Sequence, residues 1–205
     1  GAVGLALTNL NFGLALFKPI AVADRSSYYA LQATAFNDEV SGGTGGIGLV
    51  GVPGVSLSAN NLSVTINGGS APTAGGATPT GPPAPVIDFL AAGSSFISTG
   101  FRVGIGGNEF MTFTMRARTA AASGNVTLGL DFDTDGTAEV TLSSFISFQQ
   151  SFRPNGSSVI KIALTDLSFV LGDPSDPVFS LSGLNGLFLI TPQGMAARIE
   201  LPGYS

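Results

Sequence analysis

Hydrophobic and polar residues alternate along most of this chain, a pattern that predicts β-strands with one buried face. Glycine occurs 29 times and proline 12 times between these runs, and both favour turns over long helices. The closest approach to a helical period is Ile87 to Ser98, and it is weak. We therefore expect an all-β protein. The clearest alternating runs are Tyr29 to Ala35, Phe101 to Ile105, Met111 to Ala117 and Val126 to Leu130.

One strand pattern occurs three times, and internal repetition of this kind reports on architecture. Residues 5–14 read LALTNLNFGL, residues 162–171 read IALTDLSFVL, and a looser copy at residues 55–66 reads VSLSANNLSVTI. In each copy the apolar period of two slips by one residue. The slips run from Leu7 to Leu10, from Ala59 to Leu62 and from Leu164 to Leu167.

A slip of one residue moves side chains to the opposite face of a sheet unless the strand absorbs an extra residue. Asn or Asp stands at each slip, and both tolerate the left-handed backbone of a bulge or tight corner. We therefore expect strands that are kinked at these positions and bend round a core. A fainter slip of the same kind runs from Leu142 to Phe145, through Ser143 and Ser144.

Residues 68–86 form an uncharged tract rich in glycine, proline, alanine and threonine, typical of a flexible or polyproline-like loop. Related strands lie on both sides of it, so we predict a surface loop within a single domain, residues 1–205, rather than a linker. A second glycine-rich loop, Gly42 to Gly48, lacks the Lys-Ser/Thr ending of a phosphate-binding loop. The predicted fold is one domain of long, kinked antiparallel strands, arranged as a sandwich or a β-roll. A capsid-like jelly roll is a variant.

The chain is poor in charge. Hydrophobic residues make up 44% and charged residues 10%, against about 25% in a typical globular protein. Such a surface suits burial against neighbouring copies, although a monomer with a Ser/Thr-rich surface is the alternative. The net charge of −5, with only Lys18 and Lys161 as lysines, argues against nucleic acid and anionic membranes as partners. No apolar stretch is long enough for a transmembrane helix.

Several kinds of catalysis are excluded by residues that the chain lacks. Cys, His and Trp are all absent, which removes disulfides, cysteine zinc sites and the usual serine or cysteine triads. Two facing carboxylates can cleave glycosidic bonds. Here, however, the acids lie in turn-like contexts such as Asp173 to Asp176, and the usual sugar-stacking Trp is missing. No combination of nucleophile, base and orienting group can be assembled, so we predict that the protein is not an enzyme.

The strongest local motif is DFDTDGTAEV at residues 131–140. Carboxylates at alternate positions followed by Gly136 match the start of an EF-hand calcium loop. Position twelve is Leu142, so an EF-hand proper is ruled out. The motif resembles the calcium hairpin loops of integrin-type propeller repeats and related bacterial surface proteins, which usually have Asp where Glu139 stands. A solvated acidic turn is the alternative. The predicted Ca²⁺ ligands are Asp131, Asp133, Asp135, the Thr137 carbonyl and Glu139.

Four segments together resemble repeat units of giant extracellular proteins of Gram-negative bacteria, the large secreted exoproteins and adhesins. The resemblance implies secretion, tandem or assembled copies, and a structural or adhesive role without catalytic residues. A chain that begins at Gly1 fits an excised unit of this kind. The segments are residues 3–19 (VGLALTNLNFGLALFKP), 26–33 (SSYYALQA), 48–67 (GLVGVPGVSLSANNLSVTIN) and 187–197 (LFLITPQGMAA).

The predicted function is that of a structural subunit in an extracellular bacterial assembly, such as a filament, sheath, surface layer or adhesin stalk. Its partners would be other copies of itself, joined through β-strands, with neither nucleic acid binding nor membrane insertion. The very apolar segment Leu5 to Phe17 is the candidate for strand exchange. The alternative is a calcium-dependent carbohydrate-binding module that binds glycans on an aromatic platform formed by Tyr28 and Tyr29.

Overall fold

The computed structural model describes residues 3–21, 24–35, 45–70, 85–92, 100–105, 107–153 and 155–201. Every regular element in these residues is a β-strand, and every strand pair is antiparallel, so the prediction of an all-β domain with long antiparallel strands is confirmed. The strands are β1 (Gly4–Thr8), β2 (Leu10–Phe17), β3 (Ser27–Ala35), β4 (Gly46–Val50), β5 (Val55–Ser70), β6 (Phe101–Ile105), β7 (Asn108–Phe113), β8 (Thr119–Leu130), β9 (Val140–Phe152), β10 (Ser158–Asp173), β11 (Asp176–Thr191) and β12 (Gly194–Glu200).

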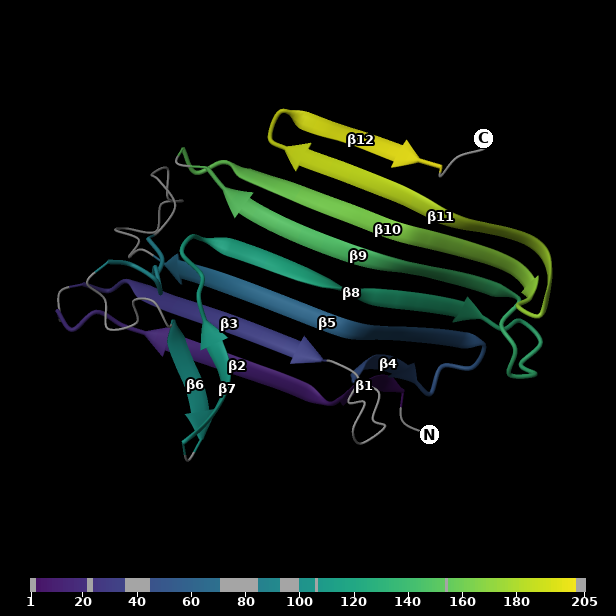
Figure 1. Ribbon diagram of the computed structural model, residues 1–205, viewed down its shortest axis with the longest axis horizontal. Helices are drawn as coiled ribbons and strands as arrows, with labels where there is room; N and C mark the ends of the chain where they lie inside the picture. Colours follow the sequence, from purple (N-terminus) through teal and green to yellow (C-terminus); the bar gives the residue numbers. More distant parts are fainter. Residues whose placement is uncertain are drawn as a thin grey trace.

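One large ten-stranded sheet dominates the molecule (Figure 1). The path across it is β1-β4-β5-β8-β9-β10-β11-β12. Strand β2 continues β1 and pairs with β3, which in turn pairs with the second half of β5. Strands β1 and β2 therefore form one edge of the sheet and β12 forms the other. A separate two-stranded sheet, β6 with β7, completes a two-sheet arrangement consistent with the predicted sandwich or roll.

The two faces of the large sheet differ in chemistry, because residues paired across neighbouring strands point to the same side. We call them the apolar face and the polar face, and two adjacent rows of paired residues illustrate them. The apolar row is Phe12, Ala33, Val64, Ala122, Phe148, Ile162, Phe188 and Ala197. The polar row is Asn11, Thr34, Ser63, Ser123, Ser147, Ala163, Leu187 and Arg198.

The predicted kinks are present at the Asn and Asp residues of the repeated strand pattern. Asn9, Asn61 and Asp166 have φ angles of 46°, 51° and 55°, in the left-handed region. The pairing of β5 with β8 shifts register between Asn60 and Ser63, and that of β10 with β9 shifts between Thr165 and Ser168. Each extra residue is thus absorbed in a bulge, so the apolar positions before and after it stay on the same face.

The fainter slip predicted at Leu142 to Phe145 is wrong, because strand β9, which contains these residues, has no bulge there. Strand β9 pairs with β8 in continuous register through this stretch. The irregularity belongs to the neighbouring strand β10, whose extra residue lies opposite Ser144. Ser144 is buried there and its hydroxyl donates a hydrogen bond to the Thr165 carbonyl at 3.1 Å.

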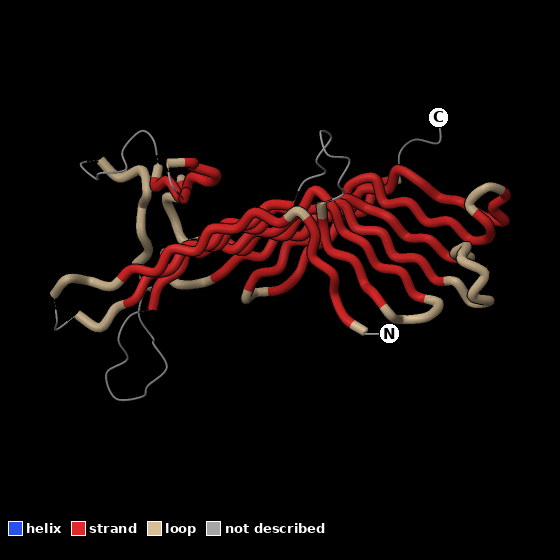
Figure 2. The backbone as a smooth tube through the Cα atoms, turned by 90° about the horizontal axis from the view of Figure 1, so that it is seen from below, coloured by secondary structure: helices blue, strands red, loops and turns tan. Residues whose placement is uncertain are grey.

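The bulges line up into a crease that crosses the sheet, which we define by Asn9, Asn61, Gly124, Ser144 and Asp166. The crease turns the two halves of the sheet relative to one another, so that Figure 2 shows one half nearly edge-on and the other spread out. Gly124 lies opposite the bulge of β5, where a Cβ atom would come within 2.5 Å of Leu62 Cδ2. Only glycine leaves room for the bulged strand at this point.

The small sheet packs on the polar face near the β2 end and encloses the hydrophobic core of the described residues. Gly13, Ala15 and Ala30 leave space on β2 and β3 for larger rings. Those rings approach one another with centroids 5.6 to 6.1 Å apart, an ordinary spacing for packed aromatic pairs. They are Phe17, Phe89, Phe101 and Phe113.

The segment before the small sheet is fixed by polar contacts. The buried Asn67 side chain donates hydrogen bonds to the carbonyl oxygens of Ile87 (2.8 Å) and Ala117 (3.2 Å). Residues 87–92 contain turns and no helix, so the helical candidate at Ile87 to Ser98 is wrong where it is described, and residues 93–98 lie outside the described part. Phe89 therefore reaches the core from a turn rather than from a helix or a strand.

The predicted loops are only partly covered by the described residues. Gly68–Ser70 belong to the end of β5, whereas residues 71–84 of the predicted loop at 68–86 lie outside the description. Gly46–Gly48 pair with β5 as part of β4, so the loop predicted at Gly42 to Gly48 is wrong at its end. Glycine is needed at position 46 because a Cβ atom would collide with the Ala59 carbonyl oxygen of the neighbouring strand.

No helix in the described part has the length and apolarity to cross a membrane.

Candidate functional site

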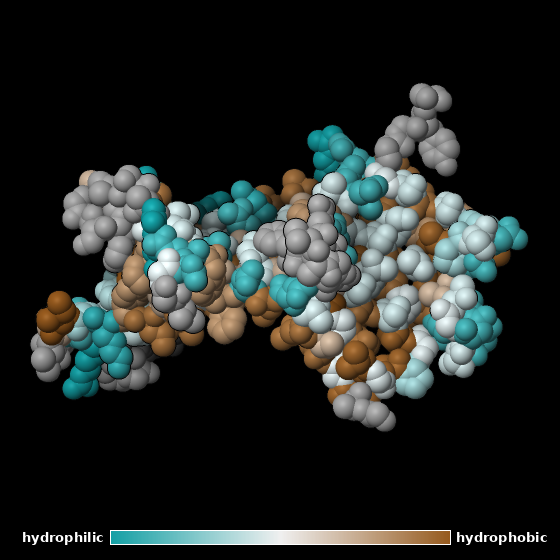
Figure 3. Space-filling view, turned by 60° about the horizontal axis from the view of Figure 1, so that its bottom comes forward, coloured by the Kyte–Doolittle hydropathy of each residue, from teal (hydrophilic) through white to brown (hydrophobic). Residues whose placement is uncertain are grey.

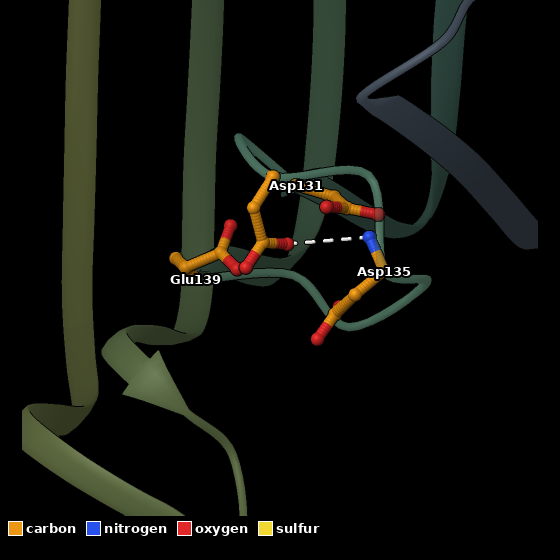
Figure 4. A group of neighbouring side chains, drawn as sticks. Asp131, Asp135 and Glu139 are labelled. Carbon is orange, nitrogen blue, oxygen red and sulfur yellow. Dashed lines mark hydrogen bonds between the residues drawn. The ribbon is translucent and has the colours of Figure 1, made fainter.

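The connection between β8 and β9 gathers four acidic side chains. Asp131, Asp133, Asp135 and Glu139 each offer a carboxylate oxygen, and these oxygens all lie within 4.8 Å of one another. Figure 4 shows Asp131, Asp135 and Glu139 in this loop. The four residues form a cluster that can hold a metal ion, because hard cations take several carboxylate oxygens at once.

Backbone hydrogen bonds shape the loop around its acids. The amides of Gly136 and Asp135 donate to Asp131 Oδ2 (2.9 Å) and Asp133 Oδ1 (3.2 Å). The amide of Phe132 donates to Glu139 Oε2 at 2.7 Å, which brings the ninth residue of the motif back to its beginning. Gly136 has a φ of 96°, a backbone geometry that glycine readily adopts and that allows the sharp turn of the loop.

Asp131 carries an oxygen that lacks a protein partner. Its Oδ1 atom is buried and accepts no hydrogen bond, whereas its Oδ2 atom is bonded to Gly136. A buried carboxylate oxygen without a donor carries an unfavourable desolvation energy unless a water molecule or a cation supplies the missing interaction. This unsatisfied oxygen lies in the residue that begins the motif, and it fits a metal ligand.

The electrostatics of the cluster also fit a cation. The Asp135 amide, through its hydrogen bond, lowers the pKa of Asp133, but partial desolvation and three neighbouring carboxylates raise it. The net effect is a pKa above the ordinary value of 3.8. Four like charges held this close repel one another, and a bound cation would relieve that repulsion.

Thr137, the fifth predicted ligand, lies in the same loop. Its amide donates a hydrogen bond of 2.7 Å to Asp135 Oδ1, so the loop holds the backbone of residue 137 next to an acidic side chain. The four acids come together as the motif predicts, including Glu139 where the resembling loops have Asp.

The second acidic turn serves a local purpose. Asp173 Oδ1 accepts hydrogen bonds from the amide and the hydroxyl of Ser175, both at 2.7 Å, at the tight connection between β10 and β11. These bonds lower the pKa of Asp173. The predicted turn is therefore confirmed at Asp173, whereas the acidic stretch Asn37 to Glu39 lies outside the described residues.

The proposed aromatic platform is not formed by its two tyrosines. Tyr28 and Tyr29 are consecutive in β3 and point to opposite faces of the sheet, since side chains alternate along a strand. Tyr29 pairs with Leu16 on the apolar face, and Tyr28 pairs with Phe17 on the polar face. The two rings cannot stack against one sugar.

Two large surfaces are exposed in the structure, and the sequence identifies the first, at the strand-exchange candidate Leu5 to Phe17, but not the second. The first is the β1–β2 edge, which Figure 3 brings forward and which carries exposed hydrophobic side chains such as Leu5 and Phe12. The second is the whole apolar face, on which no described Val, Leu, Ile, Met or Phe side chain is buried. Alternation predicted which residues share a face, but no local signal says whether a second layer lies over that face.

Comparisons with known proteins found no relative. No family model matches the chain, and neither the search of curated proteins nor the search of solved structures found a significant match.

Proposed function

We propose that the protein is a structural subunit of an extracellular bacterial assembly whose copies associate through the edges of their sheets. The observation that carries the proposal is the unprotected edge formed by β1 and β2. An edge strand offers a row of backbone donors and acceptors, on which another chain can add a strand.

Natural sheets usually protect their edges with charged side chains, proline or short strands. Residues 3–17 contain no charged residue and no proline, and β1 and β2 together extend along both halves of the sheet. Their large side chains are well exposed, with 64% of Leu5, 59% of Phe12 and 73% of Leu16 accessible. An edge of this composition favours association with a neighbouring chain.

Two further observations support self-association and an extracellular location. The chain has only 10% charged residues, a composition suited to close packing of copies. The segments at residues 3–19 and 48–67 resemble repeat units of giant secreted bacterial proteins, which supports an extracellular location. The assembly would take the form of a filament, sheath, surface layer or adhesin stalk.

The test places charge on the edge without touching the apolar face. Ala6 and Asn11 lie on the polar face of β1 and β2, so the double variant Ala6→Lys/Asn11→Lys adds two charges to the edge alone. We expect this variant to lose large assemblies in electron micrographs and in sedimentation velocity, because charged edge strands resist pairing.

The matched control is Ser56→Lys/Ser58→Lys, which adds the same charges to exposed positions of β5, a strand inside the sheet. We expect the control to assemble like the original protein. If the original protein is free of assemblies, or if both double variants assemble equally well, association through this edge is wrong.

Calcium is the cation that we assign to the acidic loop. The cluster offers only oxygen ligands, with acids at alternate positions before Gly136, as calcium loops do. The unsatisfied Oδ1 atom of Asp131 and the mutual repulsion of the carboxylates both favour a bound cation. Calcium would rigidify the connection between β8 and β9.

The calcium assignment is tested by melting temperature. Ligand binding stabilises the folded state by about 2.7 kcal/mol when the free ligand is at 100 times its dissociation constant. We expect Ca²⁺ to raise the melting temperature relative to a chelator, and Asp133→Asn to reduce that increase. Asp173→Asn, in the other acidic turn, serves as the control and should keep the full increase. An equal melting temperature with Ca²⁺ and with chelator would contradict the assignment.

A further inference from the structure

The molecule exposes far more surface than a compact protein of its mass. A folded monomer of 20.6 kDa is expected to expose about 8,900 Å². This chain exposes 13,028 Å², roughly 4,000 Å² more than that expectation. The large sheet is a single layer over most of its area, as Figure 2 shows, so a second layer is missing from most of it.

The uncovered layer is apolar. Across the middle of the sheet one row of the apolar face consists of Leu57, Leu128, Leu142, Phe169 and Leu181, one residue from each of five neighbouring strands. The small sheet that forms the local core packs on the opposite face, against Gly13, so it covers none of this row.

The apolar face also lacks charge. Apart from Asp173 and Asp176 at the turn between β10 and β11, the charged residues paired inside the sheet are Lys161, Arg198 and Glu200, and these three belong to the polar face. A sheet with one apolar face normally buries that face against a second layer. Exposing the face to water is unfavourable by about 25 cal/mol for each Å² of apolar surface. The described residues supply no such layer from the chain itself.

We propose that the apolar face is covered by the same face of a second copy, so that two chains form a two-layer sandwich. This inference rests on the proposed self-association, but it concerns the face of the sheet rather than its edge. Stable dimers bury about 800 Å² on each partner, and permanent ones bury more. The row of the apolar face from Phe12 to Ala197 crosses eight strands, β2, β3, β5 and β8 to β12, so the face offers a broad continuous surface for such an interface.

Shape and charge favour a second copy over other occupants. Two sheets of the same twist stack face to face at about −30°, so a twisted sheet is complementary to a copy of itself. A lipid surface would be favoured by a basic rim, whereas this chain has a net charge of −5 and only eight Lys and Arg residues. A second copy presents the same apolar face, so its binding does not require basic residues around the interface.

The test compares two positions on the same strand. Leu142 and Phe145 both lie on β9 and are 38% and 39% exposed, but Leu142 points to the apolar face and Phe145 to the polar face. Both are changed to Lys in the Ala6→Lys/Asn11→Lys background, where edge association is blocked. We expect the edge variant and its Phe145→Lys derivative to be dimers in analytical ultracentrifugation.

The Leu142→Lys derivative should instead be a monomer, with a dimer dissociation constant raised roughly 30-fold or more, because its charge would be buried without a partner. It should also bind a hydrophobic dye that the dimers exclude. A monomeric edge variant would overturn the proposal, as would a Leu142→Lys derivative that remains dimeric.

Lipid as the occupant has its own outcome. A monomeric edge variant that binds zwitterionic phosphatidylcholine vesicles through the apolar face would replace the second copy by lipid and overturn the proposal. Failure of the edge proposal can be distinguished from failure of the face-to-face dimer. If edge association is wrong, the original protein and the edge variant will form assemblies of the same size.

Discussion

At single positions, the backbone of this protein depends on Asn and Asp residues that adopt left-handed geometry. Asn9, Asn61 and Asp166 occur at equivalent places in a repeated strand pattern, and all three have positive φ angles. These kinks were predictable because the residue type and the slipped period are both local signals. The slip that the sequence indicates in β9 belongs to β10, whose extra residue lies opposite Ser144, because adjacent strands share the irregularity of one bulge.

Asn61 allows a direct test of the kink. Its side chain is exposed, so a substitution changes the backbone preference with little effect on packing. Asn61→Ala should lower the free energy of unfolding by roughly 1–2 kcal/mol, because a Cβ-bearing residue resists left-handed geometry. Asn61→Gly is the control and should be close to neutral in urea denaturation. Equal losses for Ala and Gly would show that the side chain, rather than φ, matters at this position.

Asp133 predicts a pH effect with a defined sign. Its pKa in the folded state is raised above 3.8, mainly because desolvation and three carboxylates outweigh the Asp135 hydrogen bond. The stability that it contributes is therefore present below pH 3.8 and is lost as the pH rises through the folded-state value. Without a cation, the ionised cluster destabilises the loop at neutral pH.

The measurement is a carbon-detected NMR titration of the aspartate carboxyls. Without calcium, Asp133 should titrate at a higher pH than Asp24 and Asp173, whose pKa values are lowered mainly by hydrogen bonds from Ser26 and Ser175. Adding Ca²⁺ should move the Asp133 midpoint to lower pH and leave the other two unchanged. A midpoint for Asp133 below that of Asp173 in the absence of calcium would refute this order.

At the scale of elements, the chain combines one long sheet with a small one that packs locally. The strands were predictable from their period of two, and the pairing of β3 and β8 with β5 confirms which side chains share a face. The burial along β3 does not follow that period, since Tyr29 is exposed and Ala30 is buried. The position of β6 and β7 on the polar face was not predictable. Gly13 and Ala15 make room for them because their side chains are small, and small residues leave no hydrophobic pattern in the sequence.

The small sheet should therefore unfold separately from the large one. Phe113 is fully buried in the local core, and Phe113→Ala should lower the free energy of opening of β6 and β7 by about 3–5 kcal/mol. Hydrogen exchange should show this loss at the amides of β7, with the amides of β9 and β10 unaffected. Phe110→Ala, on the same strand and 48% exposed, is the control and should have little effect. Equal exchange in both variants would contradict a separate unit.

At the scale of the whole molecule, the structure is a wide sheet with an uncovered apolar face. Its all-β class was predictable from composition and period. Its layering was not, because alternation identifies the buried side of a strand without identifying what buries it. Likewise, the acids of residues 131–139 could be grouped from their spacing, whereas the unsatisfied Oδ1 atom of Asp131 depends on burial that only the folded loop creates.

The number of strands on the path across the sheet has a consequence for growth. Eight strands lie on that path, each antiparallel to the next, so its first and last strands run in opposite directions. A copy added edge to edge would continue this alternation without being turned over. All subunits in such a row would point the same way, and the row would have two chemically different ends. One end would present β1 and β2 and the other β12, so a terminating protein that matches one of these edges would cap the row at one end and leave the other end free to grow.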